Sequence, residues 1–152
     1  MVENRIALKC AHGCRNYGER LSCPPHILSI EEFRKILSEY SDELLLVEEH
    51  DTEGVQDILE AWGKLQKESF HKMLELEQEA FRKGFIFAHL LRPGPCNECE
   101  KCSLKKCVTP EIRRFPPEAV GVNLQEVLEK AGIKLEFCKP DKTVCVGILL
   151  VR

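Results

Sequence analysis

Four cysteines within twelve residues constrain this chain more than any other sequence feature. Cys96, Cys99, Cys102 and Cys107 form the pattern C-x2-C-x2-C-x4-C. Packing does not explain them, because a hydrophobic core needs bulk and cysteine supplies little of it. Three thiols on one tight turn lie close enough to hold a single inorganic centre. The run therefore predicts a metal-binding loop.

The spacing of the first three cysteines is that of bacterial ferredoxins, in which three ligands hold one iron–sulfur cluster and a fourth cysteine follows. Ferredoxins have three residues before the fourth cysteine and a proline directly after it. Here four residues precede Cys107, and the proline comes later, at Pro110. The pattern indicates a metal centre strongly and an iron–sulfur centre in particular.

A second cysteine set lies near the N-terminus. Cys10, Cys14 and Cys23 follow the spacing C-x3-C-x8-C, and two prolines come directly after Cys23. The glycines at positions 13 and 18 and the proline pair predict an irregular loop rather than a helix or strand. Such a loop can wrap a cofactor while its backbone N–H groups point at cluster sulfides. We interpret this trio as a second set of metal ligands.

The total of nine cysteines is odd, and a reducing cytosol would not favour a disulfide framework. Metal ligation is therefore the preferred interpretation. No apolar run reaches the roughly 18 to 20 residues that span a bilayer, and the first residues lack the layout of a signal peptide. The net charge of −3 gives no drive toward nucleic acid or membrane. We predict a cytoplasmic protein with neither as a partner.

Hydrophobic periodicity predicts the secondary structure. Helices are expected at 29–40, with Ser29 as the cap, at 52–83, ended by Gly84, and at 123–130, with Asn123 as the cap. Strands are expected at 42–48, 85–91, 134–138 and 144–151, the first two of them buried, and an extended connector at 110–117. These elements predict one α+β domain over residues 1–152, with a small mixed or antiparallel sheet, packed helices and two cysteine-rich loops.

These motifs also resemble a known family. The carriers are Cys10, Cys14-Arg-Asn-Tyr-Gly and Cys23-Pro-Pro, the four-cysteine run, and the downstream segment Arg-Arg-Phe-Pro-Pro-Glu-Ala-Val-Gly-Val-Asn at 113–123. Together they are similar to a prokaryotic family of predicted metal-binding proteins, catalogued as domain of unknown function 2284. The resemblance covers nearly the whole chain. It implies metal binding, with iron–sulfur as the expected chemistry, and no established reaction.

Two assignments of the ligands are open. In the first, Cys96, Cys99, Cys102 and Cys107 bind one four-iron cluster, and the N-terminal trio binds a separate centre. In the second, Cys107 joins the N-terminal trio, and the other three recruit a remote ligand, Cys138 or Cys145. We prefer the first assignment, because it asks for no distant partner.

The other candidate ligands can also be interpreted without a metal. His12 or His26 would complete the N-terminal trio, although either is more often a supporting or solvent-exposed group. His89 is a hydrogen-bond partner for the cluster loop or a satisfied core histidine. Cys138 and Cys145 lie among apolar neighbours, so small buried hydrophobes are the default interpretation for both.

The predicted function is a 4Fe–4S protein with an electron-transfer or accessory redox role. Alternatives are a zinc-binding structural or interaction module, and an enzyme with an open iron site at the N-terminal trio. Basic residues near the four-cysteine run suggest a docking face for an acidic redox partner protein. The preferred interpretation is that they offset the negative centre. These residues are Lys101, Lys105, Lys106, Arg113 and Arg114.

Overall fold

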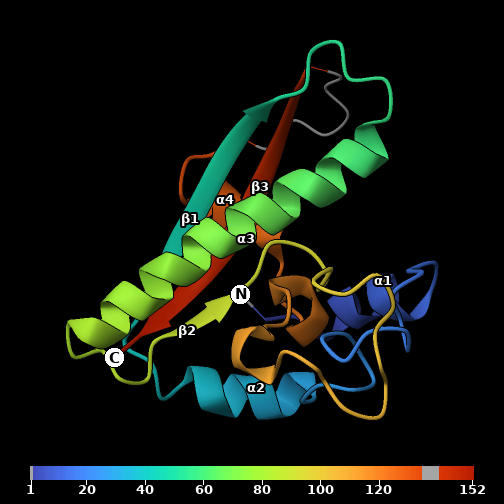
Figure 1. The fold of residues 1–152 in the computed structure, drawn as a ribbon. Helices are drawn as coiled ribbons and strands as arrows, with labels where there is room; N and C mark the ends of the chain where they lie inside the picture. Colours follow the sequence, from blue (N-terminus) through green and yellow to red (C-terminus); the bar gives the residue numbers. More distant parts are fainter. Residues whose placement is uncertain (1, 135–140) are drawn as a thin grey trace.

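A computed structural model describes residues 2–134 and 141–152, which form an α+β fold around a three-stranded antiparallel sheet (Figure 1). The strands are β1 (Asp42–Asp51), β2 (His89–Leu91) and β3 (Lys142–Val151), in the spatial order β1-β3-β2. The α+β class is confirmed, and the sheet is antiparallel. The strand expected at 134–138 lies, apart from its first residue, outside the described residues.

The central strand, β3, is buried on both faces. Ile148 and Leu150 face one hydrophobic cluster, which contains Phe33 and Val120. Leu149 and Val151 face the other cluster, on the side of α3 (Ile58–Arg82). Successive side chains of a strand point to opposite faces, so the continuous apolar run at the end of the chain is what a strand between two layers requires. The sheet therefore separates two layers of helices.

The expectation of a buried strand at 42–48 is wrong in one respect. The strand forms and extends to Asp51, but its residues are exposed or only partly buried. Leu44, for example, is 49% exposed. β1 is an edge strand that pairs only with β3 in the described sheet. A short apolar run predicts a strand but does not show how many of its faces are covered.

The long helix α3 crosses the sheet (Figure 1). It begins later than the expected residue 52, because Asp57 caps it by accepting hydrogen bonds from the N–H groups of Leu59 and Glu60. Phe70, Met73 and Leu74 are buried against the sheet. The start of the expected apolar stripe is not buried: Leu59 and Trp62 are exposed.

The remaining helices are short. α2 (Ile30–Leu37) has the expected cap at Ser29, in a capping box with Glu32, and α4 (Leu124–Lys130) has the expected cap at Asn123. α3 gives way at Lys83 and Gly84, and the φ of +101° at Gly84 explains why glycine stands there. Within the described ranges, no helix combines the length and apolar character needed to cross a bilayer.

Three local expectations are corrected. Cys10 lies in a one-turn helix, α1 (Ala7–Ala11), preceded by a 3-10 turn at Asn4–Ile6, rather than in an irregular loop. Of the residues 85–91 that were expected to form a strand, only the last three do so, as β2, and Phe85–Phe87 are exposed. The connector at 110–117 contains a 3-10 turn at Pro110–Ile112 and begins another, η3 (Pro117–Val120). In each case a stretch too short for a regular pattern takes its form from its neighbours.

Candidate metal centre

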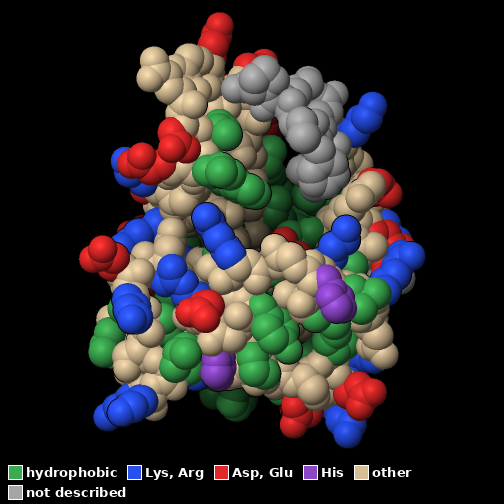
Figure 2. All heavy atoms as spheres, turned by 90° about the vertical axis from the view of Figure 1, so that its right-hand side faces the viewer, with side chains coloured by type: hydrophobic (Ala, Val, Ile, Leu, Met, Phe, Trp, Pro, Cys, Tyr) green, Lys and Arg blue, Asp and Glu red, His purple; other side chains and the backbone are tan. Residues whose placement is uncertain are grey.

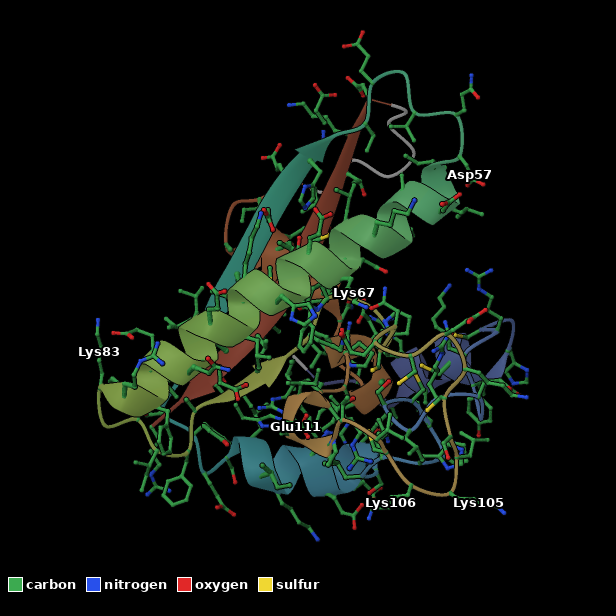
Figure 3. All side chains as sticks on the ribbon, in the orientation of Figure 1. Asp57, Lys67, Lys83, Lys105, Lys106 and Glu111 are labelled. Atoms are coloured by element: carbon green, nitrogen blue, oxygen red, sulfur yellow. The ribbon has the colours of Figure 1, made fainter. Side chains whose placement is uncertain are left out.

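The two cysteine loops lie against each other, although more than 70 residues separate them. Three consecutive residues of the N-terminal loop make the contacts. The Arg20 side chain donates to the carbonyl of Cys99 at 3.1 Å, and the N–H of Leu21 donates to Cys102 Sγ at 3.4 Å. Ser22 Oγ accepts from the N–H of Cys96 at 3.2 Å. Figure 3 shows sulfur atoms gathered in this region, beside α1 and the loop that carries Lys105 and Lys106.

All four cysteines of the later loop line one small cavity. Its other walls come from the N-terminal loop and from the segment after the last cysteine: the lining residues are Arg20, Leu21, Ser22, Cys96, Cys99, Cys102, Ser103, Cys107, Val108, Thr109 and Arg113. Each of the four cysteines is partly buried. The cavity is therefore formed by both cysteine loops together and not by the four-cysteine run alone.

The four-cysteine loop is held onto α3 at its start. Gly94 has a φ of +65°, and a Cβ there would lie 2.4 Å from the Gln66 side chain, so the turn that leads into the loop passes directly over the helix. Asn97 Nδ2 donates to the carbonyl of Gly63 at 2.8 Å. Gly63 of α3 thus supplies a backbone acceptor for the loop.

The two residues between the first pair of cysteines serve as anchors. Glu98 is almost fully buried and lies 2.9 Å from His71 Nε2 and 3.7 Å from Lys67 Nζ, both on α3. Figure 3 shows Lys67 on the part of α3 above the cysteine loops. Asn97 and Glu98 contact the helix, while Cys96 and Cys99 on either side of them line the cavity. The loop is therefore fixed by its non-cysteine residues.

Arg92 is a residue of the site that the sequence reasoning missed. It follows β2 directly and is 0% exposed. Its guanidinium lies 4.0 Å from the centre of the Phe70 ring, and its Nη2 donates to Asn97 Oδ1 at 3.0 Å. Burial lowers the pKa of Arg92, while the neighbouring Cys96, Glu98 and Cys23 act to raise it. An arginine before Pro-Gly-Pro gives no sequence signal of burial, since its environment is built by distant segments.

The N-terminal trio is also brought together. Burial raises the pKa of Cys23 to about 11, and the proximity of Cys14 and Cys10 adds to the effect, while a hydrogen bond with Ser22 opposes it. Burial likewise raises the pKa of Cys10, with smaller contributions from Cys14 and Glu118. Buried thiols of this kind are protonated at neutral pH. A bound cation would have to displace those protons, which couples metal binding to pH.

The two histidines considered as a fourth ligand for this trio are on the surface. His12 and His26 are both exposed, and the His26 ring nitrogen lies 3.0 Å from the carbonyl of Gly18. Glu118, in η3, is an acidic neighbour of Cys10, and burial raises the pKa of Glu118. A single glutamate carries no ligand signal in the sequence, so only the structure brings it to notice.

The other candidates fall in the protein interior or outside the described residues. His89 packs on Phe115 with ring centroids 5.7 Å apart, and burial is the main cause that lowers its pKa. Cys145, on β3, is 1% exposed, and its polar neighbours are Ser69 and Glu48. Its burial fits the small-hydrophobe interpretation. Cys138 lies outside the described residues.

The basic residues of this region do not share one role. Arg114 forms a largely buried ion pair with Glu77 of α3, so it belongs to the scaffold, whereas Arg113 lines the cavity. Lys105 and Lys106 lie in the four-cysteine loop, at the bottom of the view in Figure 3. The face that Figure 2 presents mixes basic, acidic and hydrophobic side chains. Among the described residues, Figure 2 therefore shows no continuous basic surface on this face.

Fold and site together define an α+β protein with two adjoining cysteine loops. No three Cys, His, Asp or Glu side chains of the described residues form a ready site for a single metal ion. The chain belongs to the family described as predicted metal-binding protein (DUF2284), whose model matches residues 1–151. No curated protein and no solved structure shows a significant match.

Proposed function

We propose that this protein binds a 4Fe–4S cluster through Cys96, Cys99, Cys102 and Cys107 and serves in electron transfer or an accessory redox role. The observation that carries the proposal is the single cavity lined by all four cysteines of this loop. Four cysteine thiolates are the usual ligand set of a four-iron cluster. This placement also supports the assignment in which Cys107 stays with its own loop.

The surroundings of the cavity suit an anionic centre. A cluster with four thiolates is negatively charged, and hydrogen bonds to its sulfurs together with nearby charge set its reduction potential. The N–H of Leu21 already donates to Cys102 Sγ, and Arg20 and Arg113 contribute positive charge to the lining. A four-iron cluster would supply a one-electron redox couple. The chain's own residues would bind it, orient it and limit the access of water.

The redox role is supported by where the cavity lies. The four cysteines are partly exposed, so the centre would be near the surface and within reach of a partner. Lys101 and Lys105 are exposed beside it and would favour an acidic partner protein over a basic one. This local charge gives a reason to expect electron exchange with another protein.

Metal analysis tests the proposal directly. Protein purified without oxygen should contain iron and acid-labile sulfide in equal amounts, about four of each per occupied four-iron site. Reduction with dithionite should produce an EPR signal that is absent from the Cys99→Ser variant. A colourless protein with stoichiometric zinc and no sulfide would instead identify the zinc-binding structural module.

A second centre at Cys10, Cys14 and Cys23 is favoured by the mutual proximity of these thiols. Three thiols leave one iron of a cluster open to another ligand or a substrate, which would suit an enzyme. The Cys14→Ser variant should lose this centre and keep the one on the later loop. Loss of all iron from Cys14→Ser would mean that the two loops hold one shared centre.

A further inference from the structure

The buried guanidinium of Arg92 has donors that its protein neighbours do not use. Nη2 is satisfied by Asn97, but Nε and Nη1 have no hydrogen-bond partner among the described residues. An N–H of a charged group that is fully removed from water and left without a hydrogen-bond acceptor is energetically costly. Such a residue persists where another group completes its environment.

The nearby carboxylate compensates Arg92 only in part. Glu98 Oε1 lies 3.6 Å from Nη2, too far for a hydrogen bond, and this oxygen is itself without a hydrogen-bond partner among the described residues. The other carboxylate oxygen of Glu98 is engaged by His71 and Lys67. Glu98 therefore serves His71 and Lys67 as well as Arg92, and it compensates the charge of Arg92 only in part. Arg92 keeps surplus positive charge.

Sulfur is the remaining chemistry around this guanidinium. Arg92 contacts Asn97 and Glu98, the two residues between Cys96 and Cys99. The thiols of Cys96 and Cys23 are its electrostatic neighbours, and these two cysteines belong to different loops. A thiolate or cluster sulfide accepts hydrogen bonds readily from a guanidinium, which presents several N–H donors in one plane.

We propose that Arg92 is a positioning residue for the metal centre: its free N–H groups donate to sulfur at the Cys96 end of the cluster, and its charge makes the cluster easier to reduce. This inference rests on the proposed iron–sulfur function. Reduction adds negative charge to the cluster, and a buried cation nearby stabilises the more negative state. Phe70 and Asn97 hold the guanidinium in place, so the effect is built into the fold.

The test is an EPR-monitored redox titration of Arg92→Met, Arg92→Gln and Arg92→Lys. The matched control is Arg114→Met, which also breaks a largely buried ion pair but acts on Glu77 of the scaffold. We expect Arg92→Met and Arg92→Gln to shift the midpoint potential to more negative values. Arg92→Lys keeps the charge and should shift it less, and Arg114→Met should leave it unchanged.

Each outcome decides the proposal. Wild-type potentials in all three iron-loaded variants would overturn it, and so would equal shifts in Arg92→Lys and Arg92→Gln. Failure of all three to fold, judged by circular dichroism, would assign Arg92 a purely structural role. Folded Arg92→Met that holds no iron, with iron retained in Arg92→Lys and Arg114→Met, would support the proposal. Absence of iron from the wild-type protein would instead refute the proposed function.

Discussion

The two cysteine loops use the same residue type in opposite ways. In the later loop, the thiols are dense in sequence and line one cavity, and Asn97 and Glu98 fasten the loop to α3. In the earlier loop, the three thiols are spread over fourteen residues, and burial keeps at least Cys23 strongly protonated. The candidate ligands of the later loop are close together in sequence, whereas the three candidate ligands of the earlier loop meet only through the fold. Four expected results would test this contrast.

The largest effect should come from removing one thiol of each loop. Cys99→Ser should abolish the EPR signal of the later-loop cluster and remove about four iron atoms per chain, because each thiolate holds one corner of that cluster. Cys14→Ser should retain that signal. Cys145→Ser is the control, since Cys145 lies on β3 beside Ser69 and should not affect iron content. Loss of that signal from Cys14→Ser as well as from Cys99→Ser would remove the distinction between the loops.

Releasing the later loop from α3 should have the next largest effect. Asn97→Ala removes the hydrogen bond to Gly63 and the acceptor for Arg92. We expect the free energy of unfolding to fall by about 2 to 3 kcal/mol, because the Arg92 guanidinium would lose its one described hydrogen bond in a buried site. Urea titration of metal-free protein measures this. Exposed Gln125→Ala, which loses only a bond to Glu129, should cost far less.

Cutting the link between the loops should cost less again. Ser22→Ala removes the acceptor of the Cys96 N–H and the hydroxyl beside Cys23 Sγ. The expected loss is about 1 kcal/mol in the free energy of unfolding. Iron should also leave the protein faster in the presence of a chelator, because the cavity would be less well closed. An unchanged rate of iron release would show that the earlier loop does not help to retain the cluster.

The smallest expected effect is on the pH dependence of the free energy of unfolding, and it concerns His89 on β2. Burial lowers the pKa of His89, with Arg114 adding to the effect and Glu77 opposing it. A lowered histidine pKa means that the unfolded state binds the proton more readily, so the free energy of unfolding is highest above the ordinary pKa of 6.5 and falls as pH decreases.

His89→Phe should weaken this decline between about pH 7 and pH 5, as measured by urea unfolding of metal-free protein. His12→Phe, at an exposed position, is the control and should leave the decline unchanged. A decline that is the same in His89→Phe would show that other groups cause the acid sensitivity.

Several elements of the fold could be predicted because their signals are local. Ser29 and Asn123 cap helices through side chains that bond backbone three residues on, and Gly84 ends α3 with a positive φ. The apolar run at 144–151 indicated a strand, and the structure shows that this strand, β3, is buried on both faces. The expected extent of burial was wrong for β1, because an edge position is decided by which strands pair and not by the strand's own residues.

For the site, the sequence by itself determined the ligands on offer: the two cysteine motifs, their spacing, and membership of a family described as metal-binding. Only the tertiary structure decided their arrangement. It brought 20–22 against the later loop, buried Arg92 beside cysteines of both loops and put Cys145 in the core. The physical reason is the range of the interactions. The spacing of the cysteines decides which thiols can meet within one turn of the chain, whereas the burial of a side chain and the pairing of its charge depend on segments that meet only after folding.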